Sequence, residues 1–244
     1  MRIALIDLET APNLSWTWGK WEQDVIDFDR NWYILCFAVK WFGEKGVKTY
    51  ALPDFPLYKK DRENDKELVK KLWEVFNEAD IIVAHNGDKF DIKKSNSRFI
   101  VHELKPPSPY KTVDTLRIAR QKFAFNSNKL DDLGRELNLG RKIPHTGFHL
   151  WRGCMEGKQS AWRVMKKYNS HDVVLLEQVY ITLRAWANTH PNLNLLSNKN
   201  TCPVCAGRVE KRGFSITKTK VNQRFHCTKC GAWSSSPKEG AVIR

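Results

Sequence analysis

Two apolar segments near the start of the chain have the length and residue types of buried strands. The first is Ile3–Leu8, and the second is the almost uninterrupted run Trp32–Val39. Continuous apolar runs of this kind are typical of strands that are covered on both faces. Gly43 and Gly46 then bracket a turn, and Val47–Leu52 is expected to form the third strand of a meander.

The middle of the chain alternates between helical and strand patterns. From Asn64 to Ala79 apolar residues recur at helical spacing, and Asn64 or Asp65 is placed to cap that helix. The elements expected after it are a strand at Ile81–Ala84, a helix at Phe90–Glu103, a strand at Lys111–Val113, helices near Thr115–Phe123 and Lys129–Leu137, a loop over 140–153, and a helical region from about Gln159 to Asn188. Strands followed by alternating strands and helices predict an α/β fold, a mixed sheet flanked by helices.

Composition narrows the class of protein. The chain has 244 residues, enough for one sizeable core plus a small module. Charged residues make up 28% and apolar residues 41%, which excludes a disordered polymer and a collagen-like chain. No apolar run approaches the roughly 18–20 residues of a membrane span. Two acids end the first apolar stretch early, so the start is not typical of a signal peptide, and we expect a soluble, non-secreted protein with no membrane partner.

The positive charge is concentrated at the C-terminal end. The formal net charge is +14, and the segment 196–244, with ten basic and two acidic residues, carries +8 of it. Clustered cations attract polyanions and release their counterions. We therefore expect nucleic acid as a partner, and the basic residues expected to contact it are Lys211, Arg212, Lys218, Lys220 and Arg224.

Four cysteines lie in the same C-terminal segment. Cys202 and Cys205 form one pair, Cys227 and Cys230 form another, and 21 residues separate the pairs. Each pair places two thiolates on one tight turn, and two such turns complete a tetrahedral Zn²⁺ site. The alternative is a pair of disulfides, although nothing points to an oxidising compartment. We expect a zinc ribbon with one structural Zn²⁺ over 197–244, after a main domain over 1–190.

Carboxylates follow predicted strands and helices at three places. Asp7 and Glu9 are two residues apart on a strand and so face the same side, at its end. Asp91 follows a buried strand and opens a helix, where an acid also suits the helix dipole. Tyr168 and Asp172 are four apart and share a helical face. Each feature alone also suits a solvated strand end, a cap or a packing contact, so the argument depends on their combination.

In order and separation, these segments resemble the three exonuclease motifs of the DEDD superfamily. The matching residues are Asp7-x-Glu9-Thr10, Asn86-x3-Phe90-Asp91 and Tyr168-x3-Asp172. The third motif has the tyrosine spacing of the DEDDy branch. Over residues 1–190 the chain is similar to stand-alone phage and bacterial proteins that are related to the proofreading domains of family B DNA polymerases. The resemblance implies a ribonuclease H-like fold, 3′-5′ exonuclease activity, and a location in the cytoplasm of a bacterium or a phage-infected host cell.

The resemblance also implies the ligands of two Mg²⁺ or Mn²⁺ ions. Asp7 would bridge both ions, Glu9 and Asp172 would complete the site that activates water, and Asp91 would hold the second ion. Tyr168 would orient the attacking water through its hydroxyl. Such a set of carboxylates agrees with the chemistry of these ions, because hard divalent ions prefer oxygen ligands. Two such ions can promote an in-line displacement.

Further residues are candidates for substrate contacts. Thr10 and Asn86 belong to the motifs themselves. Trp16 and Trp18, near the first motif, can stack on unpaired bases or simply cover the edge of the sheet. Lys93 and Lys94 follow Asp91 and can grip phosphates or form a solvated helix face. Asp114 ends a predicted strand, and we interpret it as a helix cap in preference to an extra metal ligand.

The sequence thus predicts a metal-dependent 3′-5′ exonuclease that acts on single-stranded or 3′-ended DNA, with the zinc ribbon helping to hold the polynucleotide. Two alternatives stay open. One is a nucleic-acid- or protein-binding module, in which the nuclease fold is only a scaffold and the ribbon recruits a polymerase, a helicase or another protein, such as one of replication or recombination. The other is an endonuclease of ribonuclease H or resolvase type.

Overall fold

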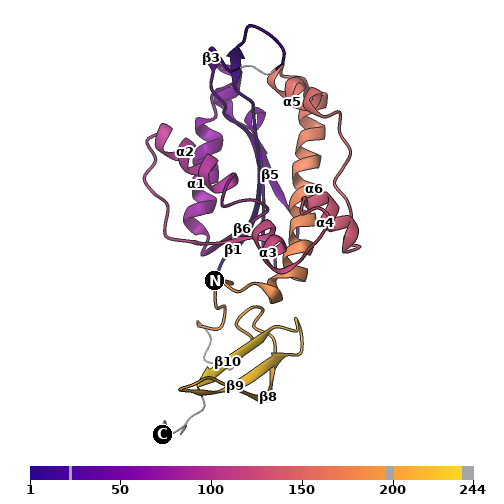
Figure 1. Cartoon of the computed structure of the whole chain (residues 1–244). Coiled ribbons are helices and arrows are strands. Elements are labelled where there is room, and N and C mark those ends of the chain that lie inside the picture. The colour runs from indigo at the N-terminus through magenta and orange to yellow at the C-terminus, as the bar shows by residue number, and fades with distance from the viewer. Residues whose placement is uncertain (22–23, 196–200, 238–244) are drawn as a thin grey trace.

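A five-stranded mixed sheet organises the N-terminal part of the computed structural model (Figure 1). The structure describes residues 1–21, 24–195 and 201–237. The strand order is β5-β4-β1-β6-β7, in which β1 is antiparallel to β4 and parallel to β6. The strands are β1 (Ile3–Thr10), β4 (Ile34–Trp41), β5 (Lys48–Ala51), β6 (Ile81–Ala84) and β7 (Lys111–Asp114). The predicted meander is confirmed, because β4 pairs antiparallel with both β1 and β5.

Helices cover both faces of this sheet, as the mixed α/β prediction required. Figure 1 shows α1 and α2 on one side and α4, α5 and α6 on the other. The α-helices are α1 (Lys66–Glu78), α2 (Asp91–Val101), α3 (Thr115–Lys122), α4 (Leu130–Glu136), α5 (Phe148–Met155) and α6 (Gln159–Leu183). Short 3₁₀ helices within the described residues are η1 (Leu52–Asp54), η2 (Pro56–Lys59) and η3 (Arg184–Trp186).

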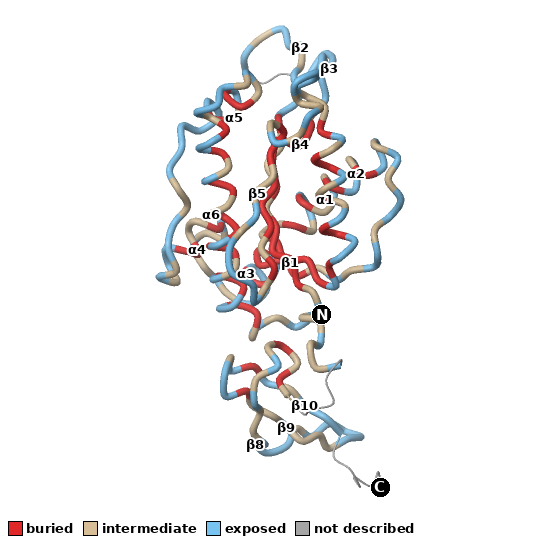
Figure 2. Tube along the Cα trace, turned by 180° about the vertical axis from the view of Figure 1, so that it is seen from behind, coloured by how far each residue is buried: buried red, intermediate tan, exposed pale blue. Residues whose placement is uncertain are grey.

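The alternation of side chains along β1 explains how one strand serves two cores. Ile3 and Leu5 pack into a cluster with residues of α6 between Val173 and Leu183, whereas Ala4 and Ile6 pack into a second cluster that includes residues of α1. Figure 2 shows the buried trace concentrated along the sheet and the inward sides of the helices. Both faces of this strand are therefore covered, which explains why the consecutive residues Ile3–Ile6 are all apolar.

Two segments differ from the predicted pattern. Residues 140–153 were expected to form a loop, but α5 begins at Phe148, and it buries Leu150 and Cys154. Its eight residues make too short an amphipathic pattern to be recognised alone, and packing against α6 stabilises it. The strands β2 (Leu14–Trp16) and β3 (Asp27–Arg30) pair in a hairpin that the sequence did not predict, because both are largely exposed.

The C-terminal residues form a separate antiparallel sheet in the order β10-β9-β8. Its strands are β8 (Val209–Ile216), β9 (Val221–Cys227) and β10 (Trp233–Pro237), and Cys202, Val204, Cys227 and Ala232 form its small core. The expected domains, 1–190 and 197–244, stay predictions, since 196–200 and 238–244 lie outside the described residues. No helix in the described part is both long and apolar enough to cross a membrane.

Candidate active site

Three of the predicted carboxylates come together where β1 meets α6. One carboxylate oxygen each of Asp7, Glu9 and Asp172 lies within 4.8 Å of those of the other two. Asp7 and Glu9 share one side of β1 because they are two residues apart, and Asp172 is buried on the facing helix. Residues more than 160 positions apart therefore build one acidic cluster.

Asp91 lies beside this cluster and is tied to the same strand. Its Oδ1 accepts a hydrogen bond from the Leu8 backbone N–H at 3.1 Å. It is buried at the first position of α2. Asp91 is not one of the three residues whose oxygens lie closest together, but its charge raises the pKa of Glu9, which shows that it acts on the cluster electrostatically.

The cluster makes ionisation costly. Desolvation, reinforced by the charge of Asp172, raises the pKa of Asp7 to about 7. Desolvation and the charge of Asp7 raise the pKa values of Glu9 and Asp91 well above their usual range. Burial also raises the pKa of Asp172, although Lys142 opposes this shift. Carboxylates held together in this way are stabilised by a cation among them.

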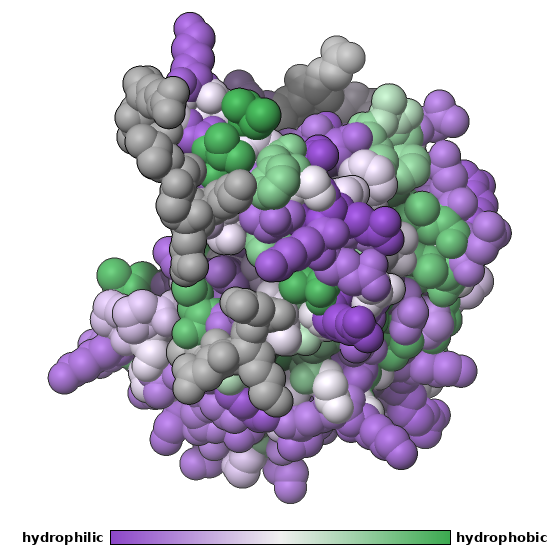
Figure 3. All heavy atoms as spheres, turned by 90° about the horizontal axis from the view of Figure 1, so that it is seen from below, coloured by the Kyte–Doolittle hydropathy of each residue, from purple (hydrophilic) through white to green (hydrophobic). Residues whose placement is uncertain are grey.

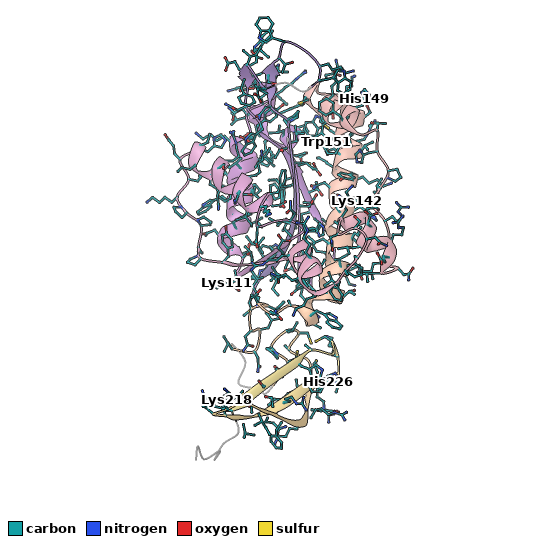
Figure 4. All side chains as sticks on the ribbon, in the orientation of Figure 1. Lys111, Lys142, His149, Trp151, Lys218 and His226 are labelled. Atoms are coloured by element: carbon teal, nitrogen blue, oxygen red, sulfur yellow. The ribbon has the colours of Figure 1, made fainter. Side chains whose placement is uncertain are left out.

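Lys142 supplies one such cation, and sequence reasoning missed it. Its Nζ lies 2.6 Å from Asp172 Oδ2 and 3.0 Å from the hydroxyl of Tyr168. Figure 4 shows Lys142 beside α6. Burial alone would lower the pKa of Lys142, but the charge of Asp172 and the hydrogen bonds to Asp172 and Tyr168 outweigh burial and raise it. A lysine in an irregular segment carries no sequence signal for this position.

Asn169 and the aromatic residues around Tyr168 complete the arrangement. Asn169 Nδ2 donates to Asp7 Oδ2 at 2.6 Å and to the Asp7 carbonyl oxygen at 3.1 Å. Tyr168 packs edge-on against His145 and Trp151, with ring centroids 4.8 and 6.1 Å away. Burial, with the charge of Asp172, raises the pKa of Tyr168, so its phenol stays protonated at neutral pH. The position of Asn169 directly after Tyr168 was the only signal that could have found it.

Comparison with known proteins places this chain in a family. A family model described as the RNase_H superfamily matches residues 22–184. The chain belongs to the RNase_H superfamily. Asp91, Tyr168 and Asp172 lie inside the matched range, and Asp7 and Glu9 precede it.

Two other comparisons add little to this assignment. No curated protein matches the chain. Among solved structures, the chain is similar to the family B DNA polymerase from the hyperthermophilic archaeon Pyrobaculum calidifontis, with 13% sequence identity and a TM-score of 0.49. The match covers 75% of this chain and 25% of that polymerase.

The carboxylates of this RNase_H superfamily member fit divalent metal ions. Asp172 Oδ1 is buried and has no hydrogen-bond partner among the described residues. Together with the oxygens of Asp7 and Glu9 it forms a hard donor set, which is what Mg²⁺ and Mn²⁺ prefer. The residues present therefore suit such ions.

The four C-terminal cysteines fit a tetrahedral metal ion. Their Sγ atoms lie within 4.8 Å of one another, with 3.7 Å between Cys202 and Cys230 and 3.6 Å between Cys205 and Cys227. Zn–S bonds of about 2.3 Å place neighbouring sulfurs about 3.8 Å apart, whereas a disulfide needs about 2.05 Å. All four thiols are free, so the geometry favours a metal centre over the disulfide alternative.

The motif residue Asn86 and its neighbour Asp114 have structural contacts. Asp114 caps α3 by accepting hydrogen bonds from Leu116 and Arg117 N–H groups, as predicted. The same carboxylate accepts the Asn86 N–H at 2.9 Å and holds Asn86 in the left-handed conformation, at φ 66°. Asn86 and Lys142 both line a pocket of about 610 Å³ beside the acidic cluster.

The other contact residues predicted in the N-terminal part lie on β1, on or near β2, and on α2. Trp16 and Trp18 are exposed, on and just after β2. Lys93 is exposed on α2, whereas Lys94 places its Nζ 3.6 Å from the centre of the Trp32 ring. Thr10 ends β1 and is half-buried. Contacts of these residues with nucleic acid stay predictions.

Proposed function

We propose that this chain is a metal-dependent 3′-5′ exonuclease of the DEDDy type, acting on DNA. The observation that carries the proposal is the acidic cluster: Asp7, Glu9 and Asp172 with their oxygens within 4.8 Å, and the hydroxyl of Tyr168 on the same helix as Asp172. Two Mg²⁺ or Mn²⁺ ions held by these residues and Asp91 would supply an activated water and stabilise the leaving oxygen.

The chain's own residues prepare the site for that reaction. Asn169 fixes the orientation of Asp7, and the Leu8 N–H fixes Asp91. Tyr168, kept protonated by its raised pKa, positions the attacking water and is no general base. Lys142 stabilises Asp172 when metal is absent. These contacts hold the ligands in place before substrate arrives, which lowers the cost of organising the site.

The net charge of +14 supports a polynucleotide substrate, and the concentration of cations near the C-terminus supports a role for that segment in holding it. Within this proposal the substrate is single-stranded or 3′-ended DNA, the four cysteines bind one structural Zn²⁺, and the protein works in the cytoplasm of a bacterium or a phage-infected host. A replication or recombination protein is a further proposed partner.

Two other functions are less well supported. A scaffold that only binds has no use for three carboxylates whose pKa values are raised above all by desolvation, since their ionisation costs folding free energy. An endonuclease of ribonuclease H or resolvase type would use similar acids, but the four-residue spacing of Tyr168 and Asp172 favours the exonuclease.

An end-labelled DNA oligonucleotide tests the proposal. We expect stepwise loss of 3′ nucleotides in Mg²⁺ and none without divalent ions. Asp172→Asn should abolish this loss, while Asp132→Asn, which changes a partly exposed acid paired with Arg135 on α4, should leave it unchanged. Cleavage of circular single-stranded DNA would favour the endonuclease, and binding without any cleavage would favour the scaffold. An RNA oligonucleotide of the same sequence tests the choice of DNA.

A further inference from the structure

Three residues on one face of the C-terminal sheet form an aromatic and cationic surface, which we call the Trp233 platform: Arg224, His226 and Trp233. Trp233 on β10 pairs directly with His226 on β9, and their ring centroids lie 4.8 Å apart. Arg224 is two residues before His226, so it projects from the same face, and its guanidinium lies 5.7 Å from the Trp233 ring. Figure 4 shows His226 within this sheet.

Trp233 does not belong to the core of this module. The core is formed by Cys202, Val204, Cys227 and Ala232, while the Trp233 side chain is 57% exposed. Burying a tryptophan is a large source of folding free energy, and here most of that area is left in water. A ring of this exposure, steadied by a neighbouring ring and an arginine, is preorganised to stack on a flat ligand.

The charge around the platform selects a polyanion. Within 201–237 seven residues are basic and one is acidic, and that acid, Glu210, is bound by Arg212 at 3.1 Å. The strand that carries Trp233 continues with Ser234, Ser235 and Ser236, which add no negative charge. Figure 3, viewed from the end of the molecule that carries this module, shows a largely hydrophilic surface.

A second exposed tryptophan surface provides a contrast. Trp16 and Trp18, on and beside the hairpin of β2 and β3, are also exposed. Residues 12–31, however, include four acids against two basic residues. This surface therefore lacks the excess of basic residues that favours a polyanion at the Trp233 platform.

We propose that the Trp233 platform stacks an unpaired base of a single-stranded nucleic acid while Arg224 contacts its phosphates. This inference rests on the proposed function for its substrate class. Stacking requires a base face that is not covered by a neighbouring base pair, so the platform prefers single strands to duplex. It thereby anchors the strand at a point away from the acidic cluster.

Fluorescence anisotropy with a labelled thymidine oligonucleotide tests the platform. The full-length chain carries Asp172→Asn to prevent hydrolysis. Trp233→Ala should weaken single-strand binding about 5- to 150-fold, the range expected for losing one stacked base. Trp233→Phe should retain most of the affinity. Arg224→Ala should weaken binding and lower the slope of log affinity against log salt by about one.

Two matched controls separate the platform from general effects. Trp186 has almost the same exposure, 59%, but packs on Phe123 in the N-terminal part. Ile216 lies in the same module and is 78% exposed, but its pairing with Val221 places it on the opposite face of the sheet. Replacing either residue by Ala should leave affinity unchanged. Metal content and circular dichroism verify that each variant is folded.

The outcomes also separate this inference from the proposed function. Unchanged affinity in folded Trp233→Ala, or an equal loss in Ile216→Ala, overturns the platform even if the chain degrades DNA. An equal loss for a duplex of the same length overturns the stacking. If the native chain never cleaves DNA but Trp233→Ala selectively loses affinity for single-stranded DNA, the platform is upheld and the exonuclease proposal fails.

Discussion

Lys142 and Asp172 form an ion pair inside the acidic cluster, with 2.6 Å between Nζ and Oδ2. The Asp172 side chain is fully buried, whereas that of Lys142 is 30% exposed. The lysine therefore sits where it neutralises the cluster yet can move outward. This makes it the natural counter-ion of the metal-free protein, and it would compete with a divalent cation for the same carboxylate.

Replacing Lys142 by Met tests this competition. Without metal, the variant should lose about 1–3 kcal/mol of stability, because Asp172 is left without its partner in a site partly screened by water. Saturating Mg²⁺ should raise its Tm by more than it raises that of the native protein. Thermal unfolding with and without Mg²⁺ measures both effects, and equal Mg²⁺ shifts in the two proteins would contradict the competition.

The raised pKa of Asp7 predicts a pH dependence of the metal-free protein. A carboxyl whose pKa is about 7 when folded, against an ordinary value of 3.8, binds its proton more tightly in the folded state. The stability that it contributes is present below about pH 4 and is lost as the pH rises toward 7. Asp7→Asn cannot ionise, so its Tm should rise relative to that of the native protein across this window.

Thermal unfolding from pH 4 to 8 in metal-free buffer measures this difference. Asn at position 7 can still accept the hydrogen bond from Asn169 Nδ2, so the comparison isolates the charge. Addition of Mg²⁺ should reverse the order of the two proteins near pH 7.5. If the Tm values of the native protein and the variant changed with pH in parallel, Asp7 would ionise in the folded protein without loss of stability, which would contradict the prediction.

Tyr168→Phe tests the proposed positioning role of the hydroxyl. The ring would keep its packing on His145 and Trp151, while the contact with Lys142 would be lost. We expect kcat to fall about 10- to 100-fold, the effect of misplacing a reacting group, with KM little changed. A pH profile of kcat that keeps its shape in the variant agrees with positioning. A lost basic limb would instead indicate proton transfer by the tyrosine.

Asp65→Ala is expected to be the most damaging change outside the acidic cluster. Asp65 is fully buried and accepts hydrogen bonds from the Ile34 N–H at 2.8 Å, from Arg98 Nε at 2.8 Å and from His102. Removing the carboxylate leaves the Arg98 guanidinium without its buried ionic partner. We therefore expect the free energy of unfolding, measured in urea, to fall by about 3–5 kcal/mol. The proposed exonuclease activity should fall too, because Arg98 shares α2 with Asp91.

Asp61 offers a control for this experiment. The residue is exposed. Among the described residues, its carboxylate accepts a local hydrogen bond, from the Glu63 N–H to Asp61 Oδ1 at 2.9 Å. Asp61→Ala should change the stability by less than about 0.5 kcal/mol. Similar losses in both variants would mean that the Asp65 contacts add nothing beyond a surface acid.

Asp65 also illustrates how far sequence reasoning reaches. Its position predicted a helix cap, and it does occupy the N-cap position of α1, but its carboxylate makes no capping bond there. Asn64 instead accepts the Lys66 N–H at 3.2 Å. The local pattern located the helix start correctly, whereas the use of the carboxylate depended on β4 and α2, which pack against it from distant parts of the chain.

Local backbone geometry explains what the sequence alone determined. The two-residue period of a strand aligns Asp7 with Glu9, the turn of a helix aligns Tyr168 with Asp172, and the short cysteine spacing prepares thiolates for one ion. Each relation holds within a few residues of chain. For the same reason the apolar runs that begin β1 and make up β6, and the basic C-terminal segment, could be recognised from the residues themselves.

Only the tertiary structure decided which of these pieces meet. Lys142 reaches Asp172 across 30 residues, and Asn169 reaches Asp7 across 162. Helix α5 is stabilised by its packing on α6, and the Trp233 platform requires the pairing of β9 with β10. Such contacts depend on how buried surfaces fit together, and the energies of many weak long-range contacts leave no periodic signal along the chain.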